Sequence, residues 1–94
     1  MTLSVRWTDE ARETFDIIVE LIDTKWGFAS AQKFVRSAQS TIDNISNQPY
    51  IFKASISKNI RKAYITKQTS MFYEVRNTEI ILLYFWDNRQ EPLL

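Results

Sequence analysis

Residues 80–86 read Ile-Ile-Leu-Leu-Tyr-Phe-Trp, and the polar segment Asp-Asn-Arg-Gln-Glu-Pro follows them at 87–92. This apolar run is the longest in the chain, and it is far shorter than the roughly 18 residues that a membrane span needs. Because it is apolar at consecutive positions, it predicts a central β-strand that is covered on both faces or nearly so. Two shorter strands are expected before it, over 59–67 and 70–76, with turns at 68–69 and 77–79.

The first half of the chain predicts one short strand and two helices. Residues 3–7 alternate weakly, as a strand does. Thr8 then precedes two carboxylates, an arrangement that favours a helix N-terminus. This helix is expected to end at Gly27, and a second one to run from about Ser30 to about Ser46. The apolar stripe of the second helix comprises Ala31, Phe34, Val35, Ala38, Ile42 and Ile45.

The order strand–helix–helix–strand–strand–strand predicts the fold class α+β. With 94 residues, the chain is expected to be a single domain over 1–94. The short link at Gly27 makes the helices an antiparallel hairpin. We expect the N-terminal strand and this hairpin to pack on a mainly antiparallel sheet in two layers.

Missing residue types narrow the chemistry. The chain has no Cys and no His, so disulfides, Cys/His metal sites and Ser-His nucleophiles are excluded. Gly27 is the only glycine, which excludes a Gly-rich phosphate loop. We therefore expect no metal and no cofactor. The N-terminus does not have the pattern of a signal peptide, and a cytoplasmic location is expected.

Charge is distributed unevenly although the net charge is only +1. Residues 1–52 hold five basic and seven acidic side chains, whereas residues 53–94 hold seven basic and four acidic ones. No acidic residue lies between Asp43 and Glu74, and that interval contains Lys53, Lys58, Arg61, Lys62 and Lys67. The interval is either a solvated basic face or a docking surface for a polyanion or an acidic protein segment.

The element order, the size and several phrases resemble the RelE/ParE superfamily of toxins from type II toxin–antitoxin modules. Three phrases lie at the strand–helix junction 5–11, at the strand opening 60–62 and around the turn at 66–67 and 71–75. The most specific phrase is the ending 85–92, Phe-Trp-Asp-Asn-Arg-Gln-Glu-Pro. The resemblance covers nearly the whole chain, and it implies a toxin that a cognate antitoxin neutralises.

Members of this superfamily either cleave mRNA on the ribosome or inhibit DNA gyrase. The nucleases carry an arginine early in the third strand, and the corresponding position here is Ser70. They also have a basic residue after the fourth strand, and Arg89 matches it. The aromatic residue or His that the nucleases have nearby is absent here. The resemblance therefore favours the ParE-like branch and disfavours nuclease activity. A nuclease would use Lys58, Arg61, Lys62 and Arg89, and a degenerate toxin would only bind its antitoxin.

Binding residues are expected in the basic interval and beyond the last strand. The candidates for contact with a target or an antitoxin are Lys53, Lys58, Arg61, Lys62, Lys67 and Arg89. Arg61 and Lys62 are adjacent on a strand, so their side chains should lie on opposite faces. The expected partner is an antitoxin segment rich in Leu and Glu, lying over the sheet and the helix hairpin. DNA would be contacted only through the antitoxin, and no membrane is expected.

Overall fold

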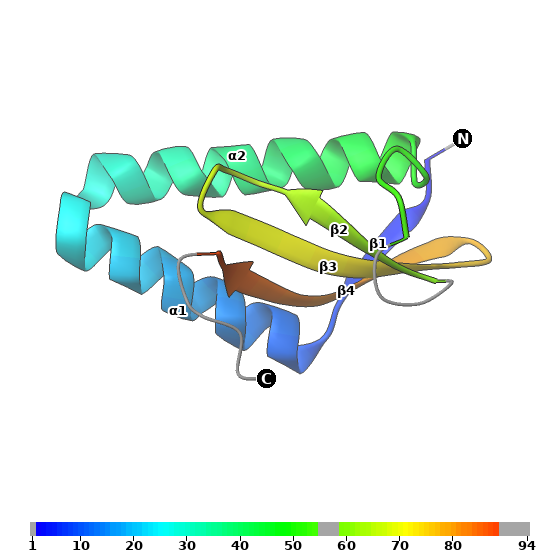
Figure 1. Cartoon of the computed structure of the whole chain (residues 1–94), viewed down its shortest axis with the longest axis horizontal. Coiled ribbons are helices and arrows are strands. Elements are labelled where there is room, and N and C mark those ends of the chain that lie inside the picture. Colours follow the sequence, from blue (N-terminus) through cyan, green and yellow to red (C-terminus); the bar gives the residue numbers. More distant parts are fainter. Residues whose placement is uncertain (1, 55–58, 89–94) are drawn as a thin grey trace.

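The computed structural model describes residues 2–54 and 59–88. Its elements are β1 (Ser4–Trp7), α1 (Asp9–Trp26), α2 (Phe28–Asn47), β2 (Ile60–Tyr64), β3 (Thr69–Arg76) and β4 (Glu79–Asp87) (Figure 1). This is the predicted order, and the α+β class is confirmed.

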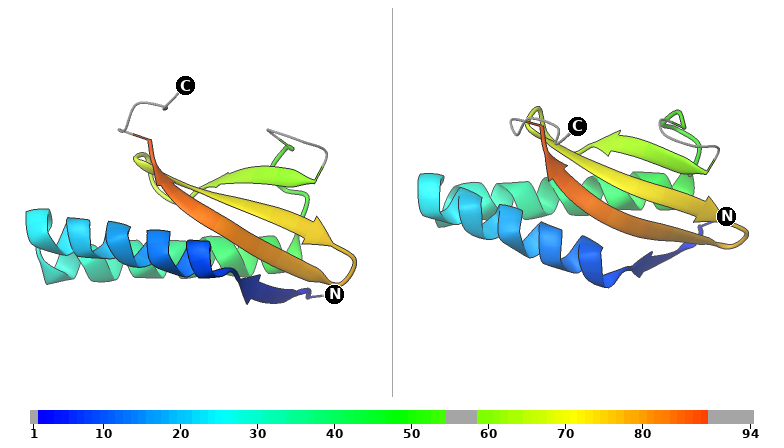
Figure 2. Two further views of the ribbon diagram at one scale, coloured as in Figure 1. Left: turned by 90° about the horizontal axis from the view of Figure 1, so that it is seen from below. Right: turned by 60° about the horizontal axis from the view of Figure 1, so that its bottom comes forward.

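The four strands form one sheet in the order β1-β4-β3-β2. β1 pairs with β4 in parallel, and the other two pairs are antiparallel. β4 is therefore an inner strand, as its apolar run predicted, but the described helices cover only one of its two faces, whereas the run predicted cover on both or nearly so. Both helices lie on one face of the sheet, and the described residues place no helix on the other face (Figure 2). We call that second face the open face.

Residues at the helix ends determine where α1 begins and where the two helices are separated. The Thr8 hydroxyl accepts a hydrogen bond from the Ala11 amide at 3.0 Å and donates one to the Leu82 carbonyl at 2.8 Å. It thus caps α1 and ties the start of the helix to β4. Gly27 has φ 95°, a conformation that glycine adopts with little strain, and it separates the two helices. As a result α2 begins at Phe28, slightly earlier than predicted.

The strands differ from the prediction mainly at one turn. β2 ends at Tyr64 rather than at residue 67, because the amides of Ile65 and Thr66 both turn back to the Thr69 carbonyl, at 2.9 and 3.3 Å. The β3–β4 turn uses Asn77, whose φ of 43° is one that asparagine tolerates. A register shift beside Phe72 leaves Leu83 of β4 without a partner in β3.

The core lies between the hairpin and the sheet. At its centre, the ring of Phe15 is 5.3 Å from Trp7, 5.7 Å from Phe34 and 5.1 Å from Phe85. These rings join β1, α1, α2 and β4. Where β1 ends, the Thr14 hydroxyl accepts a hydrogen bond from the Phe85 amide at 2.9 Å. A side chain of α1 thus supplies the acceptor for a backbone amide of β4 that β1 no longer reaches. Neither α1 nor α2, both within the described ranges, has the length and hydropathy of a membrane-spanning helix.

Candidate functional site

Among the described residues, the basic side chains of the acid-free interval do not form one patch. Lys53 lies in the segment before β2, and Lys67 lies in the β2–β3 turn; both are exposed. Arg61 and Lys62 lie on opposite faces of β2, as predicted, because Arg61 pairs with Tyr73 and Lys62 pairs with Phe72 across the sheet. Lys58 and Arg89 lie outside the described residues, and their roles stay predictions.

Arg61 is half-buried and is bound to the segment before β2. Its Nη1 donates a hydrogen bond to the Phe52 carbonyl at 2.6 Å, and its guanidinium carbon is 4.8 Å from the centre of the Tyr50 ring. Its Nε is buried, and within the described part of the chain no acceptor reaches that atom. A β-bridge joins Ala54 to Arg61. Arg61 therefore holds residues 50–54 against the sheet. A direct contact between Arg61 and a partner stays a prediction.

Tyr73, on β3, binds the chain immediately before residues 50–54. Its hydroxyl donates a hydrogen bond to the Pro49 carbonyl at 3.0 Å. Burial raises the pKa of Tyr73, while the positive charge of Arg61 and a backbone hydrogen bond with Phe52 partly oppose this rise. The phenol therefore stays neutral at physiological pH, in the form that can donate to Pro49.

This raised pKa predicts a loss of stability in alkali. In the unfolded chain a tyrosine ionises near pH 10, whereas folded Tyr73 resists ionisation. The unfolded state then binds fewer protons, so the free energy of unfolding should fall as the pH rises above about 10. Tyr73→Phe should make this fall shallower and cost about 1 kcal/mol at pH 7 through the lost hydrogen bond.

Urea unfolding between pH 7 and pH 11 measures this effect. The exposed Tyr64 provides the matched control, Tyr64→Phe. An unchanged pH dependence in Tyr73→Phe would contradict the assignment. Some alkaline loss should remain in that variant, because burial also raises the pKa of Tyr84, and the Glu10 carboxylate raises it further.

The open face carries two cross-strand rows of side chains. Register places Lys62, Phe72 and Tyr84 in one row and Tyr64, Ser70 and Trp86 in the other. The rings of Phe72 and Tyr84 stack at 4.7 Å with an interplanar angle of 25°. The Lys62 Nζ lies 5.2 Å from the ring centre of Tyr64 and 5.9 Å from that of Phe72. We call these six residues the aromatic rows.

The aromatic rows are suited to binding. Tyr64 is 58% exposed, and Tyr84 and Trp86 are half-buried, so the rows offer rings to a partner. Lys62 is their one charged residue. Ser70 is fully buried between Tyr64 and Trp86, and its hydroxyl donates a hydrogen bond to Asn88 Oδ1 at 3.1 Å. At the position that the resemblance compares with the nuclease arginine, this chain has a buried hydroxyl that is already hydrogen-bonded.

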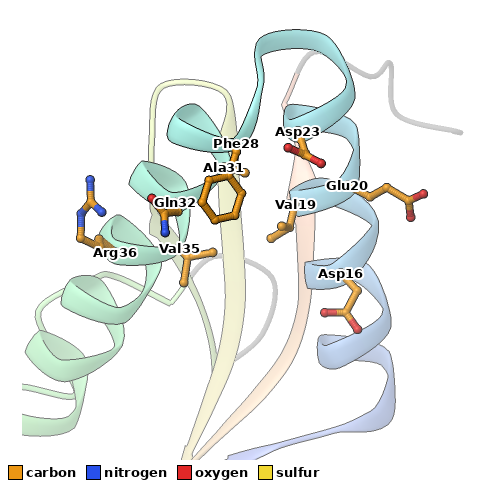
Figure 3. A pocket seen from close by; sticks show the side chains of 9 residues that line it. All are labelled: Asp16, Val19, Glu20, Asp23, Phe28, Ala31, Gln32, Val35 and Arg36. Atoms are coloured by element: carbon orange, nitrogen blue, oxygen red, sulfur yellow. The ribbon is translucent and has the colours of Figure 1, made fainter.

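A second candidate surface lies on the outer side of the hairpin, facing away from the sheet (Figure 3). It is a hollow of about 600 Å³, which we call the hairpin groove. Apolar side chains of both helices line it, and carboxylates stand on the α1 side. Its lining consists of Asp16, Val19, Glu20, Asp23, Phe28, Ala31, Gln32, Val35 and Arg36.

The hairpin groove was not predicted from the sequence. Phe28 is 69% exposed, and Val35, which the helical stripe placed in the core, is 40% exposed. The signal that could have found it is the width of the stripe, since Val35 extends the apolar surface of α2 beyond what α1 and the sheet cover. A smaller hollow of about 150 Å³ shares Asp16 and Val35 and reaches Trp7 and Ile42.

Comparison with known proteins identifies the family. Residues 5–92 match the family model described as the ParE toxin of the type II toxin–antitoxin system parDE. The chain belongs to the ParE toxin family. It is thus a type II toxin of the RelE/ParE superfamily on the ParE-like branch, as the resemblance implied. A search of curated protein sequences gave no match.

Solved structures agree with this ParE fold. A chromosomal ParDE toxin–antitoxin system from P. aeruginosa matches with a TM-score of 0.77 at 19% identity, covering 92% of this chain and 96% of that one. HP0894 from Helicobacter pylori matches at 0.62 with 16% identity, covering 94% and 97%. The YoeB dimer from Staphylococcus aureus matches at 0.63 with 12% identity, covering 89% and 94%. At these identities the likeness shows the fold.

Within this ParE toxin, the predicted site residues are distributed over several places. Lys62 lies in the aromatic rows, Arg61 fastens the segment before β2, Lys53 lies within that segment, and Lys67 lies in the β2–β3 turn. The sequence did not point to Tyr64 as a binding residue, although an aromatic residue two positions after Lys62 on a strand must share its face. In the described residues, no group of acidic side chains is placed to hold a metal ion.

Proposed function

We propose that this ParE-family toxin inhibits growth by binding a protein, and that this protein is DNA gyrase. The observation that carries the proposal is the composition of the aromatic rows. They combine four aromatic rings with one lysine, and protein interfaces are enriched in tyrosine and tryptophan at the residues that contribute most to affinity. The family match supplies the toxin class.

The alternative, ribosome-dependent mRNA cleavage, receives less support. Catalysis of phosphoryl transfer relies on cations that stabilise the charge developing on the phosphate. Here Ser70 occupies the arginine position, and Arg61 is engaged with Phe52 and Tyr50. Lys62 remains as a point charge over two rings. That arrangement favours a contact surface over a catalytic centre.

The proposed partners follow from the toxin class. A cognate antitoxin would neutralise the toxin in the cytoplasm, and DNA would be reached only through that antitoxin. Residues 1–94 would act as one domain. Co-expression with the antitoxin should raise solubility and melting temperature, because a ligand that binds only the folded state stabilises it.

Two assays on the purified protein, together with growth after induced expression, test the proposal. We expect the toxin to inhibit gyrase supercoiling of relaxed plasmid and to leave translated mRNA uncut in primer extension. Addition of the antitoxin should restore supercoiling. Codon-specific cuts would assign the chain to the nuclease branch instead. Growth inhibition with neither effect would point to another target, and absence of growth inhibition would leave a toxin that only binds its antitoxin.

A further inference from the structure

We propose that the open face binds a protein segment of its target that has two charged ends, an acidic end over Lys62 and a basic end beside Glu10. Apolar side chains of this segment would lie between its two ends, over the stacked rings of Phe72 and Tyr84. This inference rests on the proposed function, because it gives the chemistry of the target segment that the aromatic rows would contact. It also adds Glu10, a residue of α1, to the binding surface.

One cross-strand row of the open face leads from a positive charge to two aromatic rings. Register places Lys62 of β2 beside Phe72 of β3, and Phe72 beside Tyr84 of β4. The Lys62 Nζ lies 5.9 Å from the centre of the Phe72 ring, and the rings of Phe72 and Tyr84 stack at 4.7 Å. Because neighbouring strands are about 4.8 Å apart, the row spans roughly 10 Å and ends at Tyr84.

The first turns of α1 run along the edge of β4 where this row ends. The Thr8 hydroxyl donates a hydrogen bond to the Leu82 carbonyl at 2.8 Å. Two turns into the helix, the Thr14 hydroxyl accepts a hydrogen bond from the Phe85 amide at 2.9 Å. Tyr84 lies between these two points of attachment on β4, so the start of α1 is next to this tyrosine.

Glu10 places a negative charge at this end of the row. It lies in the first turn of α1, between the two threonines that bind β4. Burial raises the pKa of Tyr84, and the Glu10 carboxylate raises it further, because a phenolate there would stand close to a like charge. The row therefore has a positive end at Lys62 and a negative end at Glu10, roughly 15 Å apart.

The charges in the neighbouring row of the open face already have partners within the chain. Their ion pairs are Arg6–Glu79 at 2.9 Å and Glu74–Arg76 at 3.4 Å. Among the described residues, by contrast, neither Lys62 nor Glu10 belongs to an ion pair. A target can therefore bring an opposite charge to each of them without displacing an existing partner. Charges of two signs also fix the direction of the bound segment, since the reversed segment would place like charges together.

The two signs select a protein segment over a polyanion. A nucleic acid would bring phosphates to both ends of the row, and Glu10 would repel them. A uniformly acidic peptide would meet the same repulsion. A segment with one acidic and one basic residue about 15 Å apart satisfies both ends, which is a separation of about five residues in an extended chain.

Glu10→Lys, compared with Asp9→Lys, tests this inference. Binding of purified gyrase to the immobilised full chain measures the affinity. We expect Glu10→Lys to weaken binding at least about tenfold and Asp9→Lys to bind like wild type. Both variants remove a carboxylate from the first turn of α1, so they share any effect on the helix dipole. Consecutive helical residues do not face the same neighbours, which makes Asp9 a matched control.

A double variant separates contact with the target from an effect of the two charges on each other. Lys62→Glu/Glu10→Lys should weaken binding by about the product of the two single effects, because the two residues are well separated and meet different groups of the target. Recovery of affinity in the double variant would overturn the proposal. If Glu10→Lys does not fold, as judged by thermal unfolding, Glu10→Gln replaces it and Asp9→Asn becomes its control.

Growth after induced expression distinguishes failure of this inference from failure of the proposed target. If wild type binds gyrase and Glu10→Lys binds like Asp9→Lys, the inference falls and gyrase remains the target. If wild type inhibits growth without binding gyrase, and Glu10→Lys alone loses toxicity, the inference holds for another protein and gyrase falls. If both variants stay toxic in that case, both proposals fall. A wild-type chain that neither binds gyrase nor inhibits growth also overturns both.

Discussion

Lys62→Glu is expected to abolish most of the growth inhibition while the protein stays folded. Lys62 is the one charge in the aromatic rows, and its side chain lies over Tyr64 and Phe72 without an ion pair in the described residues. Reversal of this charge would place a carboxylate in the centre of the contact with the target. A central interface residue of this kind contributes about 2 kcal/mol or more, which is roughly a thirtyfold loss of affinity.

Titration of gyrase supercoiling against toxin concentration measures this loss. Tyr64→Ala should act in the same direction, because Tyr64 is the most exposed ring of the two rows. Lys33→Glu reverses a charge on α2, in the helix layer rather than on the open face, and should retain wild-type inhibition. Thermal unfolding of all three variants should remain close to wild type. Full activity of Lys62→Glu would remove the aromatic rows from the target interface.

The largest loss of stability is expected for Phe85→Ala. Phe85 is 2% exposed, and its ring packs at 5.6 Å from Trp7 and 5.1 Å from Phe15. Truncation of a buried phenylalanine leaves a cavity and costs about 3–5 kcal/mol. A domain of this size has a free energy of unfolding of only about 5–14 kcal/mol. Phe85→Ala should therefore lose a large part of the total stability.

Phe28→Ala is the matched control for Phe85→Ala, since it removes the same atoms from an exposed position. Its free energy of unfolding should change by less than about 1 kcal/mol. Urea unfolding measures the free energy of unfolding of both variants. Equal losses in the two variants would show that the Trp7–Phe15–Phe85 cluster does not hold the layers together.

The sequence alone could predict only part of how the residues of the binding surfaces are arranged. Strand alternation correctly predicted that Arg61 and Lys62 lie on opposite faces of β2. It could not predict which of these two residues lies on the face that packs against the helices. That choice depends on Ala63, which is buried and shares the face of Arg61, and on the register that pairs Arg61 with Tyr73. A register between strands is set by packing of the whole sheet, and no short segment encodes it.

The sequence by itself determined the elements and their order, because the signals for them act over a few residues. Thr8 caps α1 through its own hydroxyl, Gly27 ends it through its backbone freedom, and the apolar run 80–86 requires an inner strand. Only the tertiary structure decided what those elements present to a partner. The aromatic rows exist because the β-sheet register places Lys62 beside Phe72 and Tyr84, and the hairpin groove exists because α1 does not cover Phe28 and Val35. Both surfaces are made by residues distant in sequence, so their composition depends on how the layers pack.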